Sequence, residues 1–156
     1  MNPLVENTSI EFKRGSLSDL DEILVNERLA YSIPWSEQNM KNCLNDHYIC
    51  FLMENNNKPV GHMIIQKVLD EIQLLNVCVI PDFQGQGLGS VWLEYLFQFA
   101  QEESCNRIIL EVRSSNKSAK SLYRKHGFFK IGLRKNYYPN SSQTREDALV
   151  LQALLS

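Results

Sequence analysis

One glycine-rich segment, Gln84-Gly85-Gln86-Gly87-Leu88-Gly89, constrains this chain more than any other feature. Three of the seven glycines fall within five positions, after an apolar run that ends at Ile80 and before an apolar helical stretch that begins near Ser90. Glycine lets successive backbone N–H groups approach a ligand closely, and a helix N-terminus adds unpaired N–H donors and a partial positive charge. A strand, a glycine loop and the start of a helix therefore predict a binding site for an anion such as a pyrophosphate.

The spacing of the glycines separates several kinds of phosphate loop. A Walker A loop requires a lysine directly after its last glycine, and no lysine follows Gly89. A dinucleotide fingerprint requires Gly-x-Gly-x-x-Gly, whereas here the third glycine comes one residue early. For the segment taken alone, a glycine-rich turn without a ligand stays an alternative.

Length and composition favour one ordinary globular domain over residues 1–156, with 44% apolar and 22% charged residues. The formal charge of −2 argues against general nucleic-acid binding, which requires a basic surface. The three histidines are scattered in the sequence without metal-ligand spacing, so we expect no metal.

Several absences favour a cytoplasmic protein without a membrane partner. No apolar run approaches the roughly 18 residues that span a bilayer. The N-terminal stretch Met1–Asn7 has neither the basic start nor the apolar core of a signal peptide. The four cysteines form no Cys-x-x-Cys pair, which is typical of buried reduced thiols.

Hydrophobic periodicity predicts an alternation of strands and helices. Strands are expected over 10–14, 48–53, 60–68, 72–79, 107–112, 128–133 and 148–154. Helices are expected after a capping box of Ser18 and Asp21, over 37–44 after the N-cap Ser36, over 90–103, and over 117–126 before Gly127. Residues 134–147 read as a polar loop. This order predicts an α+β (mixed α/β) fold with a central twisted, mostly antiparallel sheet and helices on both faces.

The segment 74–112 runs from a strand through the glycine loop and a helix to a second strand. Such a crossover joins two parallel neighbours, and ligands bind at the carboxyl ends of parallel strands. We therefore expect Cys78–Ile80, the 84–89 loop, Glu111 and Asn116 to surround one cleft.

The pattern Gln84-x-x-Gly87-x-Gly89 after a strand resembles the pyrophosphate-binding motif of the GNAT superfamily of N-acetyltransferases. Several other stretches of the chain distinguish between groups of this superfamily more sharply than the glycine motif does. They resemble the RimI group, bacterial enzymes that acetylate the N-terminal alanine of the small-subunit ribosomal protein bS18. These stretches are Pro34-Trp35-Ser36, Leu69-Asp70-Glu71, Leu110-Glu111-Val112-Arg113-x-x-Asn116, Leu122-Tyr123, Gly127-Phe128, Asn136-Tyr137-Tyr138-Pro139 and Arg145-Glu146-Asp147-Ala148.

The resemblance implies that the chain binds acetyl-CoA and uses no metal. The cofactor-binding residues would be Val77, Cys78, Val79, Gln84, Gly85, Gln86, Gly87, Leu88, Gly89, Ser90 and Asn116. Many relatives carry a basic residue at the position of Gly85, so backbone donors would carry more of the binding here. Asn116 is also expected to cap the helix that follows it.

Two residues are expected to transfer protons. Glu111 lies in an otherwise apolar strand, where a carboxylate is costly unless it is used or paired. Its alternative role is that of an outward-facing residue paired with a lysine or arginine, and the resemblance favours the general base. Tyr123 is the expected acid, with an aromatic packing role as its alternative.

Other candidates concern the nucleophile and the acceptor peptide. Cys78 is not expected to act as a nucleophile, because no histidine accompanies it in the sequence and the family transfers acetyl by direct attack. Trp35, Tyr137 and Tyr138 are expected to line a peptide groove, while core packing is the alternative for Trp35.

The resemblance therefore implies an acetyl-CoA-dependent N-terminal acetyltransferase that acts on bS18, by direct attack of the amine on the thioester. Its partner would be the N-terminus of that small-subunit ribosomal protein, without direct contact to nucleic acid or membrane. Two alternatives stay open: an enzyme that acetylates a small amine such as a polyamine or aminoglycoside, and a non-catalytic acyl-CoA sensor.

Overall fold

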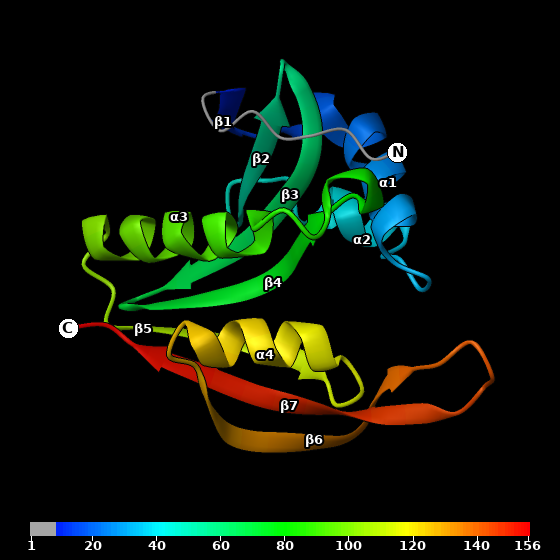
Figure 1. The fold of residues 1–156 in the computed structure, drawn as a ribbon, viewed down its shortest axis with the longest axis vertical. Coiled ribbons are helices and arrows are strands. Elements are labelled where there is room, and N and C mark those ends of the chain that lie inside the picture. The colour runs from blue at the N-terminus through cyan, green and yellow to red at the C-terminus, as the bar shows by residue number, and fades with distance from the viewer. Residues whose placement is uncertain (1–8) are drawn as a thin grey trace. The chain divides into compact units, whose positions relative to one another are not determined.

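The structure is a computed structural model that describes residues 9–156 (Figure 1). The interpretation of Met1–Asn7 as a segment without a signal peptide lies outside the described residues. The strands are β1 (Ile10–Arg14), β2 (Ile49–Asn55), β3 (Lys58–Val68), β4 (Glu71–Val79), β5 (Arg107–Arg113), β6 (Phe129–Pro139) and β7 (Arg145–Leu154). The helices are α1 (Leu20–Ala30), α2 (Glu37–Asn42), α3 (Leu88–Glu102) and α4 (Lys117–Lys125), with short 3-10 turns η2 (Leu17–Asp19) and η3 (Pro81–Phe83).

The predicted order of elements and the mixed α+β class are confirmed. Hydrogen-bonded neighbours give one sheet with the strand order β1-β2-β3-β4-β5-β7-β6. The pairings β1–β2, β2–β3, β5–β7 and β6–β7 are antiparallel. β4 and β5 form the predicted parallel pair, in which Glu71–Leu74 face Arg107–Leu110.

The chain divides into two compact units, each described here by itself. The first comprises residues 9–66 and 75–91. Its core joins apolar side chains of α1 and α2 to those of β2 and β3. The helical spacing in α1 presents one apolar face, and β2, which is buried on both faces, contributes Cys50 and Leu52 to this core. The buried members are Leu20, Ile23, Leu24, Met40, Cys50, Leu52 and Ile64.

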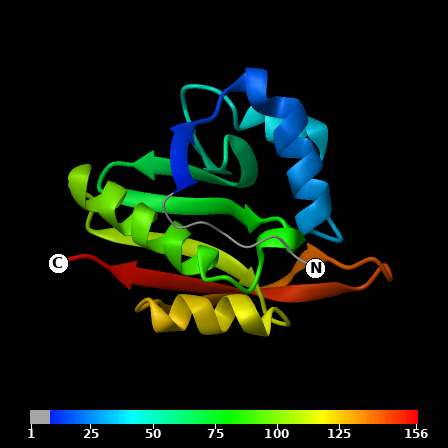
Figure 2. The same ribbon diagram turned by 45° about the horizontal axis from the view of Figure 1, so that its top comes forward.

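The second unit comprises residues 67–74 and 92–156. β5 alternates in burial, with Ile108, Leu110 and Val112 buried. Phe128 contacts the ring of Phe97 from α3 and the ring of Tyr123 from α4, both edge to face. Beyond this aromatic cluster, β6 and β7 run side by side as a long hairpin (Figures 1 and 2).

Two local predictions are wrong. The capping residues before α1 are Ser16 and Asp19 rather than Ser18 and Asp21, because the Ser16 N–H donates to Asp19 Oδ2 at 2.9 Å and the turn η2 comes before the helix. The polar segment 134–147 is a loop only between Pro139 and Arg145. β6 is an edge strand of the sheet, and most of its residues are exposed. It therefore lacks the alternation of apolar and polar residues that predicts a half-buried strand.

The predicted helix stop at Gly127 is confirmed, with φ +90°. No atom lies within 4 Å of the position that a Cβ would take there, so a side chain would cost backbone strain alone. We expect Gly127→Ala to lower the free energy of unfolding by about 1–2 kcal/mol, measured by urea denaturation.

The matched control is Gly132→Ala in β6, where an added Cβ would make an ordinary 3.6 Å contact with Val150. Its free energy of unfolding should stay equal to that of the wild type or rise slightly. Equal destabilisation by the two variants would contradict the assignment of backbone strain to Gly127.

Candidate functional site

The predicted anion loop follows η3 in the first unit and leads into α3. Gly85 and Gly87 both have positive φ, at +76° and +83°, which ordinary side chains rarely adopt. The space beside both glycines is open, since nothing lies within 4 Å of either Cβ position. Consecutive N–H groups in such a turn form a concave donor surface, and the first turn of α3 adds N–H groups that the helix cannot satisfy. The loop thus has open space beside both glycines and a backbone conformation compatible with the predicted anion site.

Side chains fix the strand that precedes this loop. The Tyr31 hydroxyl donates to the carbonyl of Val77. Gln84 Nε2 donates to the carbonyl of Val79 at 2.7 Å, and so ties the start of the loop back to the end of β4. The main chain of β4 is therefore held in place on either side of Cys78.

Glu111 lies on β5 in the second unit, and its two carboxylate oxygens differ. Oε1 pairs with Arg134 Nε at 3.1 Å, and the side chain is 26% exposed. Oε2 is buried and accepts no hydrogen bond from the described residues. The ion pair that was the alternative role of Glu111 exists, and it involves Oε1.

Asn116 and Tyr123 belong to α4 and its start. Asn116 Oδ1 accepts the Ala119 N–H at 3.1 Å, which confirms the predicted N-cap. Tyr123 is buried against Phe128, and its hydroxyl donates to none of residues 9–156. Burial raises the pKa of Tyr123 to about 12, so the phenol keeps its proton at neutral pH.

Tyr137 and Tyr138 lie in β6 with their rings in edge-to-face contact at 5.0 Å. Arg134 lies 5.5 Å from the ring of Tyr137, and Arg113 lies 4.6 Å from the ring of Tyr138. Burial first, and then the negative charge of Glu111, raise the pKa of both tyrosines. The pair thus stays protonated, with Tyr137 exposed and Tyr138 half-buried.

A buried polar cluster in the first unit was missed from the sequence. His62 Nε2 lies 2.9 Å from Glu27 Oε1, and Asn76 Nδ2 donates to the same oxygen at 3.0 Å. Cys78 Sγ lies 3.4 Å from both ring nitrogens of His62. The statement that no histidine accompanies Cys78 is therefore wrong, because β3 and β4 bring together residues 16 positions apart.

The geometry of this cluster does not activate the thiol. An atom equidistant from both imidazole nitrogens lies along the in-plane lone pair of neither, so Cys78 is poorly placed to give its proton to His62. Burial raises the pKa of Cys78 far above its ordinary value, which keeps the sulfur protonated. Glu27, His62 and Cys78 could supply three ligands to a metal ion, but the Glu27 oxygen nearest to the ring already accepts two hydrogen bonds.

Glu27 is the anion of this cluster and is almost fully buried. Its Oε2 accepts the backbone N–H of Trp35 at 3.0 Å. Burial by itself would raise the pKa of Glu27, but the hydrogen bonds from His62, the Trp35 amide and Asn76 together lower it below its ordinary value. The indole of Trp35 packs half-buried against the core of the first unit, as its alternative role required.

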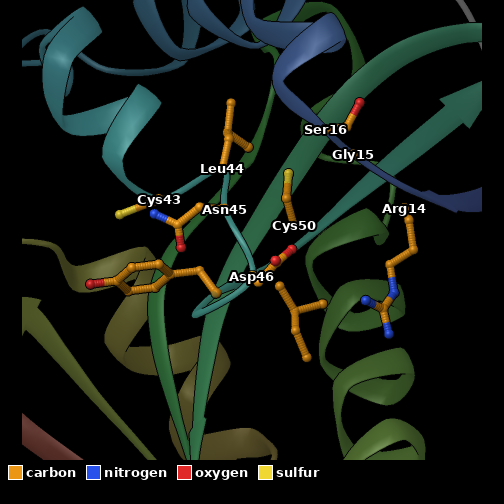
Figure 3. Close-up of a pocket in the computed structure, with 10 residues that line it drawn as sticks. Arg14, Gly15, Ser16, Cys43, Leu44, Asn45, Asp46 and Cys50 are labelled. Atoms are coloured by element: carbon orange, nitrogen blue, oxygen red, sulfur yellow. The ribbon is translucent and has the colours of Figure 1, made fainter.

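A pocket of about 430 Å³ lies elsewhere in the first unit (Figure 3). Its lining includes Arg14 at the end of β1, Asp46 before β2, and Cys50. None of the predicted site residues lines it.

The loop belongs to the first unit, whereas Glu111, Asn116 and Tyr123 belong to the second. The prediction that they surround one cleft stays a prediction. Within residues 9–156, no helix combines the length and apolar character needed to cross a bilayer.

Residues 17–128, which extend through both units, match the model of the Acetyltransferase (GNAT) family. The chain belongs to this family. It is 39% identical over 137 residues to the [ribosomal protein bS18]-alanine N-acetyltransferase of Haemophilus influenzae, covering 88% of this chain and 93% of the relative. The fold is similar to the crystal structure of the ribosomal-protein-S18-alanine N-acetyltransferase of Escherichia coli, with a TM-score of 0.89, 35% identity and 94% of each chain covered.

A GNAT acetyltransferase of Elizabethkingia anophelis, whose structure contains acetyl-CoA, shares the fold with a TM-score of 0.77. The two sequences are 20% identical, and the superposition covers 94% of this chain and 99% of the Elizabethkingia chain. The predicted family, the fold and the class of enzyme, an N-acetyltransferase, are thus confirmed.

The lowered pKa of Glu27 predicts a dependence of stability on pH. A carboxyl group whose pKa lies below its ordinary 4.5 in the folded state stabilises the fold above that pH, and its contribution is lost as the pH falls through the folded-state pKa. Glu27→Gln does not titrate there, so the difference in free energy of unfolding between the wild type and the variant should shrink below about pH 5. Urea denaturation of both proteins over a pH series measures this difference in free energy of unfolding.

Exposed Glu22, on the same helix, supplies the control variant Glu22→Gln. A difference for Glu27→Gln that stays constant from about pH 6 to about pH 3 would contradict the assignment.

Proposed function

We propose that this chain transfers the acetyl group of acetyl-CoA to the N-terminal alanine of ribosomal protein bS18. The relatives that carry this activity in their names are aligned over most of both chains, as given above. The observation in this chain that supports the proposal most directly is the open, positive-φ loop of Gly85 and Gly87 at the start of α3. Because the substrate is a ribosomal protein, we propose that the reaction takes place in the cytoplasm.

In this proposal the backbone N–H groups of the loop bind the pyrophosphate of acetyl-CoA. The binding segment runs from Gln84 to Ser90, and no lysine or arginine occurs in it. Backbone donors and the partial charge of the helix therefore provide the local electrostatic attraction. The main chain of Val77, Cys78 and Val79 is proposed to lie along the pantetheine arm, with one N–H polarising the thioester carbonyl. Asn116 uses its oxygen as a cap, which leaves its amide N–H groups for the same arm.

Glu111 and Tyr123 supply the proton transfers. An α-amino group with a pKa near about 7.7–8.0 is largely protonated at neutral pH and must lose a proton before it attacks. Glu111 Oε2, which is free of hydrogen bonds from the described residues, is proposed to accept that proton directly or through water. Tyr123 retains its proton at neutral pH and is proposed to donate it to the departing thiolate.

Trp35, Tyr137 and Tyr138 are proposed to contact the acceptor peptide. Tyr137 is 44% exposed and offers a large apolar surface with a hydroxyl at its end. The indole of Trp35 is half-buried in the core, so its contribution to peptide contact would come from its exposed edge and its backbone.

The deciding experiment incubates the protein with acetyl-CoA and peptides that differ at residue one, and follows acetylation by mass spectrometry. A peptide with the bS18 N-terminal sequence and a free alanine should be acetylated at its α-amino group. The same peptide with a blocked N-terminus and an internal lysine is the control. Acetylation of polyamines or aminoglycosides alone would overturn the proposed substrate, and binding of acetyl-CoA without transfer to any amine would favour a sensor.

Glu111→Gln tests the proposed base. We expect kcat to fall about 10²–10⁴-fold, because a positioned proton acceptor typically contributes that much. The Kd for acetyl-CoA, measured by calorimetry, should stay within about twofold of the wild type, since the base acts on the amine.

Glu71→Gln is the matched control, because Glu71 forms a comparable ion pair with Arg107 at 2.9 Å in the same unit. It should leave kcat unchanged. Arg134→Gln removes the ion pair of Glu111 but keeps the carboxylate, and should retain more activity than Glu111→Gln. If both variants lose activity equally, Glu111 acts through the ion pair and not as a base.

A further inference from the structure

The buried carboxylate of Glu27 connects three separate segments of the first unit. Its Oε1 accepts hydrogen bonds from His62 of β3 and Asn76 of β4. Its Oε2 accepts the backbone N–H of Trp35, which lies between α1 and α2. Oε1 is thus bound to the sheet, and Oε2 is bound to the segment between α1 and α2 that contains Trp35, a proposed contact of the acceptor peptide.

The same segment has a second connection to the same strand. Tyr31, the residue that follows α1, donates its hydroxyl hydrogen bond to the carbonyl of Val77. Asn76 and Val77 are adjacent in β4, so the segment 31–35 is attached to this strand directly at Tyr31 and, through the carboxylate of Glu27, indirectly at Trp35. Val77 belongs to the main chain that is proposed to lie along the acyl carrier.

We propose that Glu27 is a positioning residue, which holds Trp35 in the orientation that receives the N-terminus of the acceptor peptide. This inference rests on the proposed function. A backbone N–H bound to an ionised acceptor is held more tightly than one bound to a neutral group. Glu27 touches no reacting atom and acts on the acceptor through Trp35.

Charge and burial favour this arrangement over a passive packing role. Leucine or methionine would fill the same buried volume without the cost of removing a charge from water. The carboxylate instead meets three polar donors from three elements, and its side chain is 1% exposed. Such a network specifies one arrangement of its segments, because any shift leaves a buried polar group without a partner.

The test compares Glu27→Gln with Glu22→Gln, an exposed residue on the same helix. Glutamine keeps the size of the side chain, and its single oxygen can still accept hydrogen bonds, but the NH2 group that replaces the other oxygen cannot accept any, so the three donors are not all satisfied at once. We expect Glu27→Gln to raise the KM for the bS18 N-terminal peptide about tenfold, with kcat and the Kd for acetyl-CoA changed less than about threefold. Glu22→Gln should match the wild type in the peptide KM, in kcat and in the Kd for acetyl-CoA.

A second readout needs no substrate. Hydrogen exchange of the Trp35 backbone amide, followed by NMR, should be faster in Glu27→Gln than in the wild type and unchanged in Glu22→Gln. A wild type inactive on every N-terminal peptide would overturn the proposed function, and this exchange rate would then still report whether Glu27 holds Trp35.

The proposal is overturned if Glu27→Gln lowers the Tm but leaves the peptide KM within twofold of the wild type, or if the Trp35 amide exchanges at the wild-type rate. Tyr31→Phe removes the hydrogen bond from Tyr31 to the Val77 carbonyl and leaves the buried charge of Glu27 intact. This variant tests the proposal if Glu27→Gln fails to fold. It should raise the peptide KM without changing kcat. An unchanged KM in that variant would equally reject the coupling of this segment to β4.

Discussion

A carboxylate that folding removes from water constrains the first unit more than any apolar contact does. Moving an ion into a protein interior costs several kcal/mol unless hydrogen bonds replace those of water. Glu27 meets this requirement with donors from β3, β4 and the segment after α1. Since successive residues of a strand face opposite sides, a slip of β4 by one position would turn Asn76 away from Glu27. The polar network thus fixes a register that apolar residues alone would leave less strictly defined.

The sequence predicted those features that depend on neighbours along the chain. β4 forms over Glu71–Val79, where the apolar run from Ile72 predicted a strand. The predicted glycine loop is present, with positive φ at Gly85 and Gly87, and α3 begins within it, at Leu88, two residues before the predicted start at Ser90. The cap of α4 by Asn116 and its end at Gly127 followed from the preferences of single residues at helix ends. In each case the determining interaction extends over fewer than about five residues.

The features that escaped prediction depend on contacts between distant segments. His62 lies 35 residues from Glu27, and Asn76 lies 49 residues from it, so no local pattern could show that they meet. A single acidic residue in a helix ordinarily reads as part of the solvated face. The extension of β6 escaped for another reason, since an exposed edge strand with a register shift between Arg134 and Tyr138 carries no apolar alternation.

Glu111 shows why the structural and the catalytic readings of one residue need not exclude each other. The ion pair with Arg134 uses Oε1 alone, and the same guanidinium lies over the ring of Tyr137. The ion pair and the ring contact both restrain the guanidinium, and the ion pair orients the carboxylate through Oε1. The remaining oxygen is then kept in one position without a hydrogen bond from the described residues. A general base requires both a defined direction and an unoccupied lone pair, and the ion pair supplies the first without consuming the second.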